Sequence, residues 1–148
     1  MSGDPLLRFA AEHREALSVL DRLEQAATGL RQGDEPEGQF AVAREAHAFL
    51  AGPVRVHNEN EERALFPLLG PDAPTAVFVE EHQRLRELER ELERALAEDD
   101  PLGAADVAVE LVELLRAHID REDTALFPLA RERLGAEGLA RVAAVLGD

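Results

Sequence analysis

The stretches HNENEERALFP (residues 57–67) and HIDREDTALFP (residues 118–128) are two copies of one motif, and they determine how the chain folds. Each copy begins with a histidine, has a glutamate four residues later and ends in Ala-Leu-Phe-Pro. Residues four positions apart project from one face of a helix, so each copy presents an imidazole and a carboxylate together. The copies start 61 residues apart, which is about the length of two helices. This spacing predicts two helical hairpins related by a pseudo-twofold axis.

The remainder of the chain has the apolar periodicity of helices. We predict helices over residues 4–30, 39–69, 75–98 and 101 to about 123 or beyond, a polar turn over 31–38, and a short amphipathic helix over 135–148. Asp4 and Asp99-Asp100-Pro101 are typical helix starts. Gly52-Pro53 predicts a kink, because an interior proline removes a backbone hydrogen bond. The fold class is therefore all-α, an up-down-up-down four-helix bundle with a short C-terminal fifth helix, in one domain over residues 1–148.

Composition excludes several classes of protein. Thirty-one acidic and sixteen basic residues give a formal charge of −15, which repels nucleic-acid phosphates and anionic lipids. The chain has no cysteine, hence no disulfide or thiolate site, and it has no lysine for Schiff-base or P-loop chemistry. Neither a membrane span nor a signal peptide is evident. We expect a soluble cytoplasmic protein with neither nucleic acid nor a membrane as partner.

The other histidines extend the repeated motif. With a rise of about 1.5 Å per residue, His82 lies at nearly the same height as His57 and His118 on antiparallel neighbouring helices, and His13 agrees less closely. Four helices then each contribute one histidine to one layer. Helical bundles use inward imidazoles and carboxylates of this kind to hold two metal ions. His47, ten residues before His57, faces another side of its helix, and we expect it outside the site.

This pattern resembles the hemerythrin-like (HHE cation-binding) family, and the resemblance covers essentially the whole chain. It implies a four-helix bundle with a non-haem centre of two carboxylate-bridged iron ions. The implied ligands are four terminal histidines and two bridging glutamates: His13, His57, His82, His118, Glu61 and Glu122. The two Leu-Phe-Pro tails would be apolar plugs closing the ends of their helices. Imidazole and carboxylate ligands also suit manganese and zinc, which the sequence does not exclude.

Two positions depart from the oxygen-carrying hemerythrins. Arg86 stands four residues after His82, where those carriers have a second histidine. They also place an aspartate five residues after the last histidine, which fits Asp123. We favour Glu122 as the bridge, because five residues turn about 140° around an ordinary helix and Asp123 would need a local bulge. Because the second histidine of the third helix is missing, two histidines remain for each metal, and each metal would have open positions for water, peroxide or a further carboxylate such as Glu81. The neighbouring acids are expected to be solvated or to orient the imidazoles: Glu59, Glu62 and Asp123.

Three functions are compatible with these residues. The first is a di-iron protein that binds or reduces small oxidants (O2, peroxide or NO) in oxidative or nitrosative stress defence or sensing, with a catalase-like or peroxidase-like activity as one form. The second is a non-catalytic iron-binding regulatory module that acts through an unidentified protein partner. The third, a metal-free helical scaffold, is disfavoured by the histidine layer. The sequence leaves open the physiological ligand, the metal in vivo and the oligomeric state.

Overall fold

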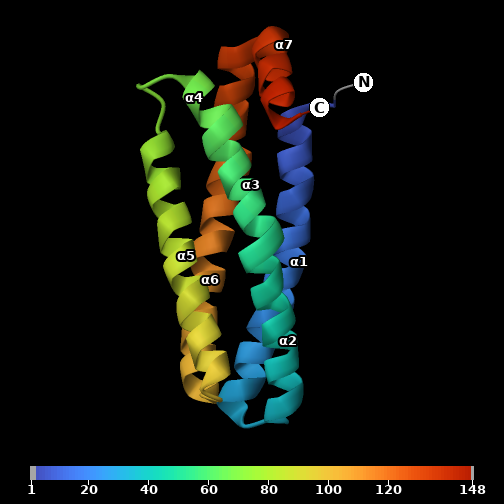
Figure 1. Ribbon diagram of the computed structural model, residues 1–148, viewed down its shortest axis with the longest axis vertical. Coiled ribbons are helices and arrows are strands. Elements are labelled where there is room, and N and C mark those ends of the chain that lie inside the picture. Colours follow the sequence, from blue (N-terminus) through green and yellow to red (C-terminus); the bar gives the residue numbers. More distant parts are fainter. Residues whose placement is uncertain (1–2, 148) are drawn as a thin grey trace.

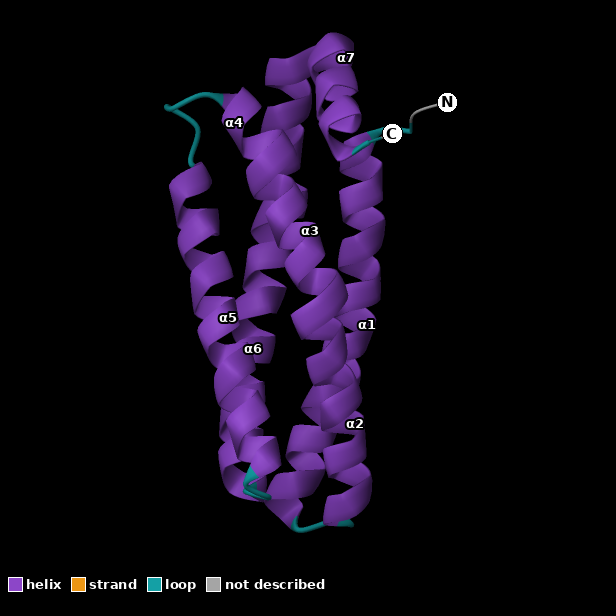
Figure 2. Ribbon diagram, viewed as in Figure 1, coloured by secondary structure: helices purple, strands orange, loops and turns teal. Residues whose placement is uncertain are grey.

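The computed structural model describes residues 3–147, which form helices joined by short turns and contain no strand. Four long rods lie side by side (Figure 1), and loops occur only at their ends (Figure 2). The rods comprise α1 (Pro5–Gln32); α2 (Pro36–Phe49), η1 (Leu50–Val54), α3 (Arg55–Asn60), η2 (Glu61–Leu65) and α4 (Phe66–Leu69); α5 (Thr75–Ala97); and α6 (Pro101–Arg121), η3 (Glu122–Leu126) and α7 (Phe127–Leu146). The all-helical bundle is confirmed. Among the described helices, none has both the length and the apolar character to cross a membrane.

The helix starts follow from the residues that precede them. The Oδ1 atom of Asp4 accepts a hydrogen bond of 2.9 Å from the N–H of Leu6, and Asp100 accepts one of 3.0 Å from the N–H of Gly103. Both caps are as predicted, and a proline follows each of them. The polar turn predicted over 31–38 is wrong in extent, because α2 already begins at Pro36, whose fixed φ suits a first helical turn.

Three π-helical segments interrupt the rods, and each lies at a proline. Pro53 is inside η1, whereas Pro67 and Pro128 follow η2 and η3 by two residues. A proline ring clashes with the carbonyl four residues earlier and donates no hydrogen bond, and a wider turn relieves both problems. The kink predicted at Pro53 therefore takes the form of a π-helical segment with helix on both sides.

The fourth rod extends well beyond residue 123, because α7 continues directly from η3. Its regularity breaks at Gly135, where φ is 61° and ψ is −170°, a conformation that only glycine adopts readily. Figure 1 shows α7 turning back on itself and the chain ending beside the start of α1. The separate helix over 135–148 stays a prediction, since residues on both sides of Gly135 belong to α7.

Buried apolar side chains form two clusters that fill opposite ends of the bundle. The larger cluster includes Leu20, Leu88 and Leu111, and the smaller one includes Phe9 and Leu126. Histidines and glutamates form a buried polar layer between them. Burying so many ionisable groups is costly unless other groups satisfy them, so this layer needs a chemical explanation.

Candidate metal centre

The polar layer contains all six residues that the sequence predicted. Each of the four rods contributes one histidine, and the two glutamates are the first residues of η2 and η3. No member is more than 6% exposed. The set is His13 on α1, His57 on α3, Glu61 on η2, His82 on α5, His118 on α6 and Glu122 on η3. The structure thus brings the six side chains together, and their role as metal ligands is a proposal.

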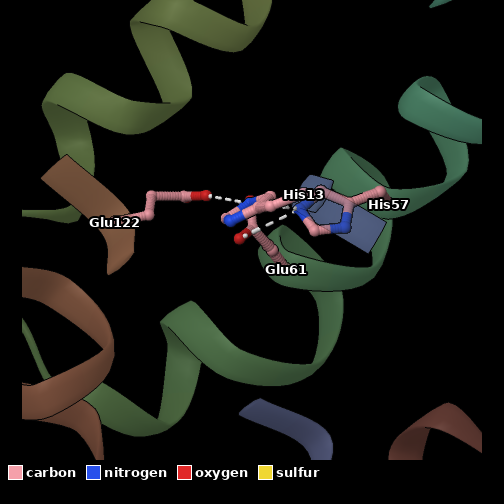
Figure 3. Close-up of side chains that lie close together, drawn as sticks. All are labelled: His13, His57, Glu61 and Glu122. Carbon is pink, nitrogen blue, oxygen red and sulfur yellow. Dashed lines mark hydrogen bonds and ion pairs between the residues drawn. The ribbon is translucent and has the colours of Figure 1, made fainter. Parts of the chain in front are cut away.

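One half of the layer is formed by the histidines of α1 and α3 (Figure 3). The Nε2 atoms of His13 and His57 lie 3.1 Å apart. His13 Nε2 is 3.0 Å from Oε1 of Glu122, and His57 Nε2 is 3.4 Å from Oε2 of Glu61. Four donor atoms, two from imidazoles and two from carboxylates, therefore lie within 4.8 Å of one another.

The histidines of α5 and α6 form the other half in the same way. His82 Nε2 is 3.3 Å from Oε1 of Glu61, and His118 Nε2 is 3.4 Å from Oε2 of Glu122. Each glutamate thus directs one oxygen to each pair of histidines. The layer offers two adjacent four-donor positions that share both carboxylates.

The outer nitrogen of each of the four layer histidines faces a carboxylate oxygen at 2.7–2.8 Å. The pairs are His13 with Asp123, His57 with Glu12, His82 with Glu62, and His118 with Glu81. An acceptor at Nδ1 favours the proton there, so Nε2 of the neutral ring is left with a lone pair that points into the layer. Carboxylates in this position orient histidines that bind metals.

The Nε2 atoms and carboxylate oxygens that point into the layer contact one another, and most of them have no hydrogen-bond partner in the described part of the chain. Six of them are buried without a hydrogen bond: both oxygens of Glu61, both oxygens of Glu122, and Nε2 of His82 and of His118. Leaving such atoms unsatisfied is costly. Lone pairs and negative oxygens that face one another are satisfied together by cations, so the donor set fits two metal ions.

The π-helical segments place phenylalanines against the histidines. In η2 the N–H of Phe66 bonds to the carbonyl of Glu61, five residues earlier, which brings the two side chains toward the same side of the rod. Phe66 then stacks on His82, with ring centroids 6.1 Å apart. η3 is built in the same way, and Phe127 stacks on His13 at 5.4 Å. Both rings belong to the smaller apolar cluster beside the layer. The Phe127 tail does not close the end of its helix, because α7 continues to Leu146.

The position at which η3 begins determines whether Glu122 or Asp123 points into the layer. The bulge is present, but it begins at Glu122 and does not turn Asp123 inward. Glu122 lies between His13 and His118, whereas Asp123 contacts only the outer nitrogen of His13. The structure thus places the favoured residue between the two halves.

Two acidic residues have positions that the sequence analysis did not predict. Glu81, considered as an extra ligand, contacts Nδ1 of His118 and the guanidinium of Arg121 instead. Burial would raise the pKa of Glu81, but Arg121 and His118 lower it below the ordinary value. Glu12, which contacts His57, was missed. A signal for Glu12 was available, because it precedes a histidine as Glu81 does in the second half of the chain.

Two other polar residues lie around the layer. Arg86 is 47% exposed and pairs with Glu59 at 3.2 Å, and it lines a cavity of about 30 Å³ together with His82. His47 belongs to neither half of the layer, as expected.

Charge repulsion in the metal-free layer falls on the two glutamates. Burial raises the pKa of Glu61 well above its ordinary value, and the nearby charge of Glu122 raises it further. Burial also acts on Glu122, but contacts with His118 and His13 lower its pKa. Without a cation, burial and the neighbouring carboxylate therefore favour protonation of Glu61.

We expect the metal-free protein to become more stable when the pH falls from 7 to 5. A folded-state pKa raised above the unfolded value gives stability that is present at low pH and lost as the pH rises through the folded pKa, and Glu61 behaves in this way. The lowered pKa values of three other glutamates reduce the stability only when the pH falls below the ordinary pKa of a carboxyl group. These residues are Glu12, Glu81 and Glu122. Urea unfolding with a chelator present measures the effect. Glu61→Gln should reduce it, and a steady loss of stability from pH 7 to 5 in the parent would contradict it.

A four-helix bundle with a buried layer of histidines and shared glutamates defines a class of cation-binding proteins. The family model described as the hemerythrin HHE cation-binding domain matches residues 4–130, and the chain belongs to this family. The resemblance seen in the sequence is thereby confirmed. Comparisons with curated proteins and with solved structures gave no match.

Proposed function

We propose that the protein holds two iron ions and binds or reduces small oxidants (O2, peroxide or NO) in cytoplasmic stress defence or sensing. His13 and His57 would be the terminal ligands of one ion, His82 and His118 those of the other, with Glu61 and Glu122 as bridges. For the architecture, we also propose that the rods follow an up-down-up-down order and that the residues after Gly135 form a short fifth helix. The observation that carries it is the convergence of buried carboxylate oxygens and imidazole lone pairs that lack hydrogen bonds.

Iron is what the family resemblance implies, and the ligand chemistry is compatible with it. Imidazoles with bridging carboxylates suit iron, manganese and zinc, and the matched family is a cation-binding one. Iron, when bound, supplies one-electron redox chemistry and open coordination positions for small ligands. The chain has no Cys, Trp or Tyr and one Met, so it presents few side chains that an oxidant would damage.

A cavity beside the layer favours a small ligand. It has a volume of about 70 Å³ and is lined by His13, His57 and His118 together with apolar groups such as Phe49 and Leu115. A cavity needs about 10–15 Å³ to hold one water molecule, so this space admits a molecule of a few heavy atoms. It touches histidines from both halves of the layer, which supports access of one small molecule to both ions.

The residues around the layer have supporting roles. The outer carboxylates keep the Nδ1 protons in place, so that each Nε2 stays available to a metal. Phe9 makes a T-shaped contact with His57, with ring centroids 5.2 Å apart, and Phe78 makes one with His118 at 5.3 Å. Together with the stacked phenylalanines they exclude water from one side of the site.

The test is anaerobic loading with Fe²⁺, metal quantification, and a visible spectrum before and after separate additions of peroxide, O2 and NO. Two irons per chain and rapid loss of peroxide are expected. Iron binding without any reaction with peroxide, O2 or NO would refute the oxidant function and favour the regulatory module that acts through a protein partner. Absence of metal binding would refute both.

We also expect the reduced protein to oxidise rapidly and irreversibly in O2, and Arg86→His to slow this reaction. Residue 86 lies one turn after His82 on the same cavity, so an added imidazole would fill a position that the parent leaves open. Stopped-flow mixing with O2 measures the rate, and Arg90→His, an exposed position on the same helix, is the control. A parent spectrum that reverts to the reduced one on removal of O2 would contradict the prediction.

A further inference from the structure

A second group of potential ligands lies outside the layer, between α2 and α5. His47 Nε2 is 3.0 Å from Oε1 of Glu89 and 3.5 Å from Oε2 of Glu93. One nitrogen and two carboxylate oxygens from these side chains lie within 4.8 Å of one another. The glutamates are four residues apart on α5, so they project from one face of that helix, and both face the histidine of the neighbouring rod.

The inner part of this group is not satisfied by hydrogen bonds. The side chain of Glu89 is only 7% exposed. Its Oε2 atom and Nε2 of His47 are buried without a hydrogen-bond partner. A buried carboxylate in this condition is costly, and a cation held by Glu89 and His47 would remove the cost. Glu93 is exposed, so the group is open to solvent on its outer side.

We propose that His47, Glu89 and Glu93 form a mononuclear site for a divalent transition metal ion. One imidazole and two carboxylates are the ligand types that Zn²⁺, Fe²⁺ and Mn²⁺ take, and water completes the coordination on the exposed side. The site is separate from the dinuclear layer, because none of its three residues contributes a donor atom there.

Arg55 determines how strongly the site binds. Its Nη2 atom lies 3.7 Å from Oε2 of Glu89 and is the positive charge nearest to that oxygen among the contacts described. The Arg55 side chain is 42% exposed, so its guanidinium can move into solvent when an ion arrives. The ion must compete with this charge, and binding is weaker than it would be without Arg55.

The test is equilibrium dialysis of the full chain against Zn²⁺, a redox-inert ion, followed by metal quantification. The parent should bind one more zinc ion per chain than His47→Gln or Glu89→Gln. Glu91→Gln, which removes an exposed carboxylate from the same helix, should bind as the parent does. If the dinuclear layer also binds zinc, the parent should hold three ions and the variants two. If the layer does not bind zinc, the parent should hold one ion and the variants none. Failure of the dinuclear proposal is therefore distinguishable from failure of this one.

Arg55→Gln gives a second readout that does not depend on disrupting the core. Removal of this charge should tighten the last zinc-binding step by about tenfold. In the parent, the ring resonances of His47 should shift at the zinc concentration where that ion binds. Equal zinc content in the parent and His47→Gln, or an unchanged affinity in Arg55→Gln, would overturn the proposal and leave His47 and Glu89 as a plain ion pair.

Discussion

Replacing His118 or His57 with alanine is expected to remove at least one of the two metal ions and most of the stability that metal provides. Each ring supplies an inward Nε2 atom close to a shared glutamate. Ligands present at a thousand times their Kd stabilise the folded state by about 4 kcal/mol. For a chain of 148 residues, that corresponds to a fall of about 10 °C in the melting temperature.

Melting curves recorded with and without a chelator separate the metal effect from the cavity that alanine creates. The parent should lose about 10 °C on chelation, whereas the two variants should lose little, because less metal is bound. His47→Ala is the control and should keep both ions of the dinuclear layer. If both variants retain two ions in that layer and the melting temperature of the parent, the ligand assignment is wrong.

Glu81→Ala is expected to weaken metal binding by about 10-fold to 100-fold, although Glu81 supplies no inward atom. Its Oε1 atom is 2.8 Å from Nδ1 of His118, and Arg121 contacts its other oxygen. Without this carboxylate the His118 ring loses its fixed orientation and the group that holds its outer proton. Competition with a chelator of known affinity measures the change.

Glu80→Ala is the matched control for Glu81→Ala. Glu80 is the preceding residue on α5 and is exposed, so its removal changes the net charge equally without touching a histidine of the layer. An effect of the same size in both variants would show that only the overall charge matters. The orienting role of Glu81 would then be refuted.

The six residues of the layer could be predicted because the sequence shows both the spacing of residues on one helix face and the heights of residues along neighbouring helices. The four-residue spacing of His57 and Glu61 places both on one helix face, and helix rise sets the heights of His13 and His82. The contact between Glu12 and His57 joins residues 45 positions apart. It depends on how two rods are rotated against each other, which helical periodicity within each rod does not determine.

The helix ends were predicted less well than the helices themselves. Pro36 was assigned to a turn although proline is favourable in a first helical turn. Pro67 and Pro128 were recognised as parts of the apolar tails, yet the sequence analysis did not predict that the backbone ahead of them widens into π turns. These segments depend on local backbone strain and tertiary packing together, and side-chain periodicity reports neither.

The sharing of the two glutamates has a mechanical consequence. The position formed by His13 and His57 receives Glu122 from the other hairpin, and the position formed by His82 and His118 receives Glu61 in return. Neither hairpin supplies all the donors of one position. Each metal ion would therefore be bound by residues of both hairpins and would link one half of the molecule to the other. The chain has no cysteine, so the metal centre would act as a reversible cross-link in place of a disulfide. Release of the ions would weaken the contact between the two hairpins before it affects the contacts within each hairpin.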